Sequence, residues 1–221
     1  MISDVEKIRH YFVKSAESFD SLYSEEKANW LMNYINHKFR RDIYERFLLS
    51  LNHFDKYKTE SILDVGCGSG RYESSLSSFK IKKITGLDCS QRMIELARTN
   101  IKQHQELELK TNFLCYDFEE YQSDETYDVV IAMGFFDYIK APVNFLKKMS
   151  KLSNHSVIAS FPSISFYRTP IRKIRYFFKN CPVYFYDIKM LEEFSKTAGF
   201  SRVDITKIKG AGMDYFVAFY K

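Results

Sequence analysis

The chain has 221 residues, a length typical of one α/β domain. With 45% hydrophobic and 28% charged residues it has the composition of a globular protein and not of a disordered one. Its longest apolar run, residues 129–136, is far shorter than the roughly 18 residues that cross a bilayer, and its first residues lack an apolar signal region. We therefore expect a protein that is neither secreted nor membrane-spanning.

The cysteines are scattered at Cys67, Cys89, Cys115 and Cys181. This spacing matches neither a disulfide framework nor a zinc site, so it predicts reduced thiols, a cytoplasmic location and no bound metal.

The net charge of +5 is concentrated in one segment. Residues 162–181 carry five basic side chains and no acidic one, which leaves the rest of the chain balanced. A protein that binds nucleic acid through a globally basic surface is therefore disfavoured.

The first 58 residues have apolar side chains at steps of three and four, which predicts helices that cover the rest of the domain. Short apolar runs and amphipathic stretches then alternate. We expect strands at 61–65, 83–87, 112–115, 127–133 and 156–161, and helices at 71–80, 90–101 and 141–151. This alternation predicts a parallel sheet with helices on both faces.

After residue 161 the pattern changes twice. A basic, aromatic and proline-bearing insertion covers residues 162–186. A helix with Asp187 as its N-cap then runs to about residue 198, with Gly199 just beyond, and strands follow at 202–208 and 215–219. We expect a single domain, 1–221, with a Rossmann-like seven-stranded, mostly parallel sheet, an antiparallel C-terminal edge and a core at 59–161.

The most informative segment is SILDVGCGSG at residues 61–70, where a strand enters a glycine-rich turn. Gly66, Gly68 and Gly70 allow a ligand to approach the backbone closely. A dinucleotide fingerprint would place its third glycine at Arg71. Asp64 would repel a pyrophosphate and favours a ligand that is cationic near this loop.

Two further acids end strands at the same edge of the sheet. Asp88 closes the second strand and can accept both hydroxyls of a ribose. Asp117 follows the third strand and offers a carboxylate for an exocyclic amine, beside the backbone amide of Phe118 for a ring nitrogen. Together these positions predict a site for an adenosine-containing cofactor.

With LDVGCGSG, LDCS, YDFEE and YDVVIAMGFFDYI, residues 61–161 resemble the class I S-adenosylmethionine-dependent methyltransferases. The resemblance implies S-adenosylmethionine as cofactor. It also implies that Met93 faces the adenine, that Met133 and Gly134 offer backbone to the cofactor's amine, and that Tyr11 belongs to an N-terminal lid.

The acceptor is expected to be a small molecule. The Asn/Asp-Pro-Pro-aromatic motif of amino-methylating DNA enzymes does not occur after the fourth strand. The aromatic and basic residues of the insertion favour an aromatic or anionic acceptor. VVIAMGFFDYI and the proline- and arginine-bearing lid also resemble, faintly, the magnesium-protoporphyrin O-methyltransferases, which implies methylation of a carboxylate oxygen. Candidate substrate-binding residues are Arg172, Arg175 and Tyr184, and candidate catalytic residues are His10, Asp137 and Tyr138.

Three alternatives stay open at this stage. A nicotinamide-dependent oxidoreductase would share the sheet and Asp88, although Asp64 and Arg71 disfavour its pyrophosphate loop. The chain could instead be a non-catalytic, cofactor-binding partner subunit. Residues 170–182 could also lie on an anionic membrane surface as a basic amphipathic helix.

Overall fold

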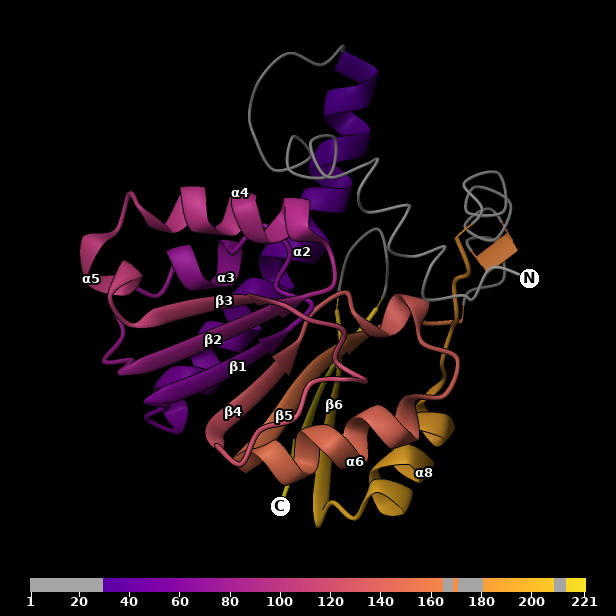
Figure 1. The fold of residues 1–221 in the computed structure, drawn as a ribbon. Coiled ribbons are helices and arrows are strands. Elements are labelled where there is room, and N and C mark those ends of the chain that lie inside the picture. Colours follow the sequence, from indigo (N-terminus) through magenta and orange to yellow (C-terminus); the bar gives the residue numbers. More distant parts are fainter. Residues whose placement is uncertain (1–29, 165–168, 171–180, 209–213) are drawn as a thin grey trace.

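The fold is a seven-stranded sheet in the order β3-β2-β1-β4-β5-β7-β6, flanked by helices (Figure 1). The structure is a computed structural model that describes residues 30–164, 169–170, 181–208 and 214–221, with side chains from residue 43 onward. The strands are β1 (Ser61–Val65), β2 (Lys83–Asp88), β3 (Thr111–Cys115), β4 (Tyr127–Ala132), β5 (Ser153–Phe161), β6 (Arg202–Lys207) and β7 (Tyr215–Tyr220). The described helices are α2 (Trp30–Lys56), α3 (Arg71–Ser74), α4 (Gln91–Ile101), α5 (Gln105–Glu108), η1 (Phe136–Tyr138), α6 (Pro142–Leu152) and α8 (Ile188–Ala198).

The first five strands are parallel, whereas β7 pairs antiparallel with both β5 and β6. This confirms the Rossmann-like, mostly parallel sheet with an antiparallel C-terminal edge. The pairing also shows that β7 is inserted between β5 and β6, so that β6 is the outermost strand.

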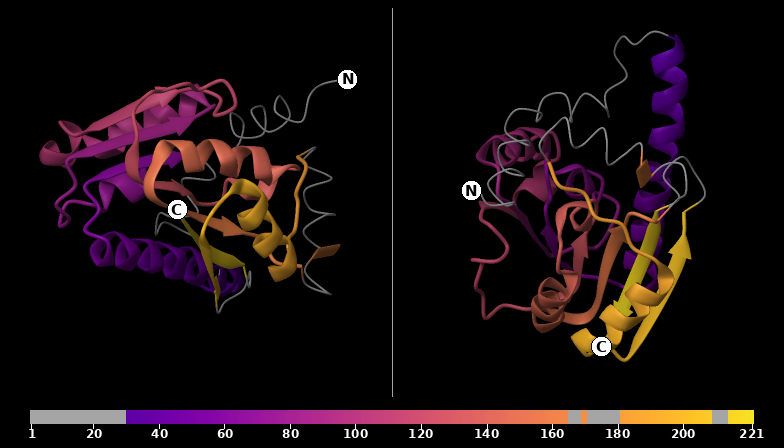
Figure 2. Two further views of the ribbon diagram at one scale, coloured as in Figure 1. Left: turned by 90° about the horizontal axis from the view of Figure 1, so that it is seen from below. Right: turned by 90° about the vertical axis from the view of Figure 1, so that its right-hand side faces the viewer.

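Helices cover both faces of the sheet and create two apolar cores. On one face, α2 and α4 bury Phe54, Ile94 and Ala97 against the sheet. On the other, α6 and α8 bury Leu146 and Leu191. The views in Figure 2 show α2 on the side of the sheet away from α6 and α8. Because side chains alternate along β1, Ile62 and Asp64 point to the face of α2 and α4.

The helix signals read from the sequence hold for α8. Asp187 is its N-cap and accepts a 2.9 Å hydrogen bond from the amide of Met190. Gly199 ends the helix in the left-handed conformation, at φ 85°.

The helix expected at 71–80 is wrong in length, because α3 ends at Ser74. Two of its serines bond the backbone one turn back: Ser74 Oγ donates to the Gly70 carbonyl at 2.8 Å and Ser75 Oγ to that of Arg71 at 2.9 Å. Such side chains compete with helix continuation. The short helices α5 and η1 were not predicted, and the remaining boundaries differ by a few residues.

Among the helices that the structure describes, none combines the length and the apolarity needed to cross a membrane. Residues 1–29 of the expected helical N-terminal lid, 1–58, and most of the basic insertion lie outside the described residues.

Candidate functional site

The glycine turn is attached to the end of β2 by its own backbone. The amides of Gly66 and Cys67 both donate to the Leu87 carbonyl, at 2.8 and 2.9 Å. The amide of Gly68 donates to Oδ2 of Asp88 at 3.0 Å, and the amide of Ser90 donates to Oδ1 at 2.8 Å. The loop and the carboxylate that the sequence analysis singled out are therefore direct neighbours, and each Asp88 oxygen keeps a lone pair for a ligand hydroxyl.

The glycines of the turn have different surroundings. All three have positive φ, but a Cβ on Gly66 would lie 3.1 Å from Phe135, and one on Gly70 would lie 3.0 Å from Ala97. A Cβ on Gly68, at φ 55°, would meet no atom of the described residues within 4 Å. The same holds for Gly134, at φ 78°, just beyond β4. Gly66 and Gly70 thus pack the loop onto the fold, while Gly68 and Gly134 border open space suited to a ligand.

Three carboxyls lie around this turn on the α2 and α4 side of the sheet. Asp64 is 2% exposed and Glu73, on α3, is 1% exposed. Burial and the adjacent Glu73 carboxyl raise the pKa of Asp64 well above its usual range. Burial raises the pKa of Glu73 to about 7. Burial also raises the pKa of Asp88 to about 6, although the backbone amides that donate to its carboxylate act to lower it. Such a concentration of buried acid favours a cationic ligand.

The third acid predicted from the sequence, Asp117, lies just beyond the end of β3. The amide of Tyr116 donates to the Asp88 carbonyl at 3.1 Å, which places the end of β3 beside the end of β2. Asp117 is partly exposed and accepts a 2.9 Å bond from the Glu119 amide. The side chain of Phe118 is buried in the core, where it contacts Phe135.

Met93 and the end of β4 flank the turn. Met93 is buried on α4, and its amide donates to the capping Ser90 hydroxyl at 3.4 Å. The amide of Gly134 donates to Ser160 Oγ at 2.7 Å, and Nη1 of Arg46 on α2 donates to the same oxygen at 3.0 Å. The ends of β4 and β5 are thereby joined to α2.

The acceptor-side candidates that the structure describes lie together after β4. Asp137 and Tyr138 belong to η1, and the amide of Tyr184 donates to the Asp137 carbonyl at 2.9 Å. The Tyr186 hydroxyl contacts the carbonyls of Phe136, at 3.1 Å, and Ile139. His10, Tyr11, Arg172 and Arg175 lie outside the described residues.

The sequence analysis missed three residues of this region: Arg46, Glu73 and Phe135. No local signal marks Arg46 or Phe135, because each acts through a contact with a distant part of the chain. Glu73 could have been found from its place three residues after Gly70, where a helix turn directs it back toward Asp64.

Residues 62–155 match the family model described as a methyltransferase domain. This confirms the resemblance to class I S-adenosylmethionine-dependent methyltransferases on which the cofactor assignment rests.

Curated proteins that are similar to this chain are named as O-methyltransferases. It is 27% identical over 152 residues to the malonyl-[acyl-carrier protein] O-methyltransferase of Halalkalibacterium halodurans, covering 67% of this chain and 51% of that protein. It is 34% identical over 95 residues to the ubiquinone biosynthesis O-methyltransferase of Rickettsia felis, covering 43% of this chain and 37% of that protein. The chain thus spans about half the length of these relatives, or less.

Among solved structures, the chain resembles the magnesium protoporphyrin IX methyltransferase of Synechocystis PCC 6803, determined with bound S-adenosylhomocysteine. The TM-score is 0.77 at 18% identity, and the match covers 99% of this chain and 100% of that one. At this identity the likeness shows the fold.

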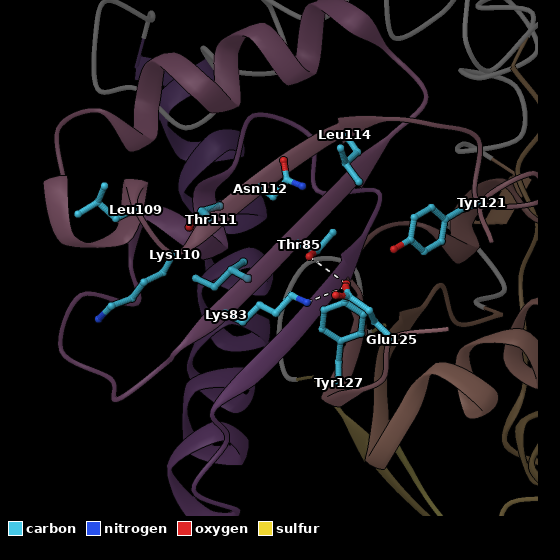
Figure 3. Close-up of a pocket in the computed structure, with 11 residues that line it drawn as sticks. Lys83, Thr85, Leu109, Lys110, Thr111, Asn112, Leu114, Tyr121, Glu125 and Tyr127 are labelled. Atoms are coloured by element: carbon cyan, nitrogen blue, oxygen red, sulfur yellow. Dashed lines mark hydrogen bonds and ion pairs between the residues drawn. The ribbon is translucent and has the colours of Figure 1, made fainter. Parts of the chain in front are cut away.

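A surface pocket of about 270 Å³ lies elsewhere on the methyltransferase fold, toward the amino ends of β2, β3 and β4 (Figure 3). Its polar groups interact with one another: Lys83 pairs with Glu125 at 2.6 Å, and the Tyr127 hydroxyl bonds Thr85 at 3.0 Å. It is separate from the glycine turn at the carboxyl ends of the strands.

Proposed function

We propose that this chain is an S-adenosylmethionine-dependent methyltransferase that moves a methyl group to an oxygen of a small anionic or aromatic molecule. The observation that carries the proposal is the direct bond between the Gly68 amide and the Asp88 carboxylate, beside open space at Gly68 and Gly134. A glycine turn, a ribose acceptor and room for a ligand occur at one edge of the sheet.

The residues present fit this cofactor. Asp88 would accept the ribose hydroxyls, Asp117 would face the adenine amine, and Met93 would lie against the adenine ring. Asp64 would balance the positive charge of the methionine part, and Gly134 would border its amine. S-adenosylmethionine supplies an activated methyl group on a sulfonium when bound.

Methyl transfer from a sulfonium needs mainly alignment and exclusion of water, because the leaving group is neutral. An acceptor that is already anionic needs no base, whereas a neutral hydroxyl does. In the second case Asp137 is the described candidate, since it lies just beyond Gly134, where the acceptor would approach. Its charge also raises the pKa of the Tyr186 hydroxyl, after the larger effect of burial.

The names of the relatives guide the choice of acceptors for assay. They suggest a malonyl thioester on acyl-carrier protein, a ubiquinone precursor and magnesium protoporphyrin IX. These compounds combine an anionic or aromatic group with an oxygen nucleophile. Transfer of a labelled methyl group from S-adenosylmethionine to each compound tests the acceptor class.

The competing functions are separated by titration calorimetry. We expect S-adenosylhomocysteine to bind and NAD(H) and NADP(H) not to bind, because Asp64 and Glu73 would repel a pyrophosphate. Tight binding of a nicotinamide cofactor would overturn the proposal. A partner subunit without catalysis would bind S-adenosylhomocysteine but transfer no methyl group to any acceptor in the panel.

We further propose that the protein works in the cytoplasm with reduced cysteines and acts on no nucleic acid. The four thiols are unpaired with one another, which suits a reducing compartment. Contact of residues 170–182 with anionic lipid would be tested with vesicles containing phosphatidylglycerol.

A further inference from the structure

A pair of buried carboxyls flanks the glycine turn along the chain. Asp64 comes from β1 and Glu73 from α3, and both side chains are more than nine-tenths buried. Within the described part of the chain, neither carboxyl oxygen of Glu73 receives a hydrogen bond of good geometry, although both oxygens are shielded from solvent. Burying an unsatisfied carboxyl is costly, and native proteins seldom tolerate it without a functional reason.

The ionisable groups whose charge affects the pKa values of this pair are themselves acidic. Asp88, at the end of β2, adds to the rise in the pKa of Asp64, and all three carboxyls raise the pKa of the buried Cys67 thiol. The Cys67 thiol therefore lies among three acids, with Asp88 already held by the amides of Gly68 and Ser90.

Charged side chains on α2 and α4 have other partners. On α2, Arg46 bonds Ser160, and on α4 Arg98 bonds the Phe113 carbonyl. His53 on α2 bonds Ser156, and burial lowers its pKa to about 4, so it carries no charge near neutrality. The pair is not arranged as a metal site either, because the described part of the chain contains no group of three His, Cys, Asp or Glu side chains placed to hold an ion.

We propose that Asp64 and Glu73 form a proton-sharing pair that receives the cationic end of the cofactor and releases a proton when the cofactor binds. This inference rests on the proposed function. In the free protein one carboxyl of the pair keeps its proton, so that two negative charges do not face each other. The positive charge of the cofactor takes the place of that proton, which passes to the solvent, and no other bond changes.

The expected pH dependence follows from this exchange. The pKa of Glu73 is raised to about 7 by burial, so the free pair is still partly protonated near neutrality. Cofactor binding should therefore tighten as the pH rises from about 6 to 8, by at most tenfold per pH unit for one released proton. Asp88, with a pKa raised to about 6, contributes mainly below that range.

The test is calorimetry of the full chain with S-adenosylmethionine and with S-adenosylhomocysteine, between pH 6 and 8. Repeating each titration at pH 7 in two buffers of different ionisation enthalpy gives the number of protons released. The variant is Glu73→Gln, which mimics the protonated carboxyl at every pH. The matched control is Glu106→Gln, at an exposed position on α5.

We expect the parent chain and Glu106→Gln to release a substantial fraction of a proton at pH 7, and Glu73→Gln to release much less. The affinity of Glu73→Gln should vary little between pH 6.5 and 8 and should be about tenfold weaker than that of the parent at pH 8. Release with both ligands identifies the ammonium as the charge that the pair senses, and release with S-adenosylmethionine alone identifies the sulfonium.

Binding by the parent chain without proton release would overturn the inference and leave the proposed function standing. Equal proton release by Glu73→Gln and the parent would also overturn it. Failure of the parent chain to bind either ligand would overturn the proposed function itself. If Glu73→Gln does not fold, the number of protons that the parent chain releases, measured in the two buffers, still tests the inference.

Discussion

The Gly68 amide and the Asp88 carboxylate hold each other in place through a 3.0 Å hydrogen bond. The bond joins the turn after β1 to the end of β2, so one side chain both fixes the loop and presents its remaining lone pairs to a ligand. A change at Asp88 should therefore affect cofactor binding and the stability of the loop together.

Replacing Asp88 with Asn should weaken binding of S-adenosylhomocysteine by one to two orders of magnitude, because charge-assisted bonds contribute about 1.5–3 kcal/mol. Titration calorimetry measures the effect. The control is Asp124→Asn, on an exposed loop, which should bind as the parent does. Unchanged affinity in Asp88→Asn would contradict the ribose assignment.

Gly68→Ala should reduce the free energy of cofactor binding by more than it reduces the free energy of unfolding. Alanine at φ 55° is strained by about 1 kcal/mol, and its Cβ would project into the open space of the site. Gly199→Ala is a matched control, since Gly199 has φ 85° and also borders open space, but ends α8 away from the turn. Both variants should lose similar melting temperature, and only Gly68→Ala should lose affinity. Equal affinity in the two variants would place the ligand elsewhere.

Without cofactor, Glu73→Gln should become more stable relative to the parent as the pH rises from 5 to 8. A carboxyl whose pKa is raised on folding binds more protons in the native state, so the stability that it contributes at low pH is lost as the pH rises through about 7. Urea unfolding at several pH values measures this difference.

The stability of Glu73→Gln must be compared with that of the parent at each pH, because His53 changes the stability of both chains with pH in the opposite direction. Burial, with a smaller contribution from Lys56, lowers the pKa of His53 to about 4, so His53 adds stability as the pH rises toward 6.5. Both chains share this contribution. A constant difference between them across the range would show that Glu73 titrates normally.

Tyr186→Phe should lower methyl transfer more than cofactor affinity. The Tyr186 hydroxyl holds η1 through the carbonyls of Phe136 and Ile139, and η1 carries Asp137 and Tyr138. Its loss should cost about 1–3 kcal/mol of stability and loosen the acceptor side. The control Tyr127→Phe removes a hydroxyl that bonds Thr85 at the other end of β4. Equal rates of methyl transfer by Tyr186→Phe and Tyr127→Phe would show that the position of η1 does not affect the reaction.

Local patterns in the sequence were sufficient for most of the fold. Most strands were short apolar runs between turn residues, and the caps at Asp187 and Gly199 depend on nearby residues alone. The contact between the glycine turn and Asp88 was also predictable, because consecutive parallel strands bring their carboxyl ends together.

The rest depended on interactions that the local pattern does not encode. The serines after Gly70 end α3 early by bonding backbone carbonyls, although the apolar spacing there favoured a longer helix. Glu73 carries no signal of burial in the sequence, and it is buried where α3 packs beside α4. Arg46 meets Ser160 across 114 positions of sequence, a distance at which residue spacing carries no information.

The position of β7 also determines the order in which this sheet can be completed. β6 precedes β7 in the chain but joins the sheet through it, and β7 pairs with β5 on its other side. During synthesis, therefore, the edge of β5 stays open after residues 202–207 have been made, and it closes only when residues 215–220 arrive. We expect a nascent chain that pauses before residues 215–220 are made to expose the unpaired edge of β5. Chaperones bind such edges, and strands of other chains can pair with them.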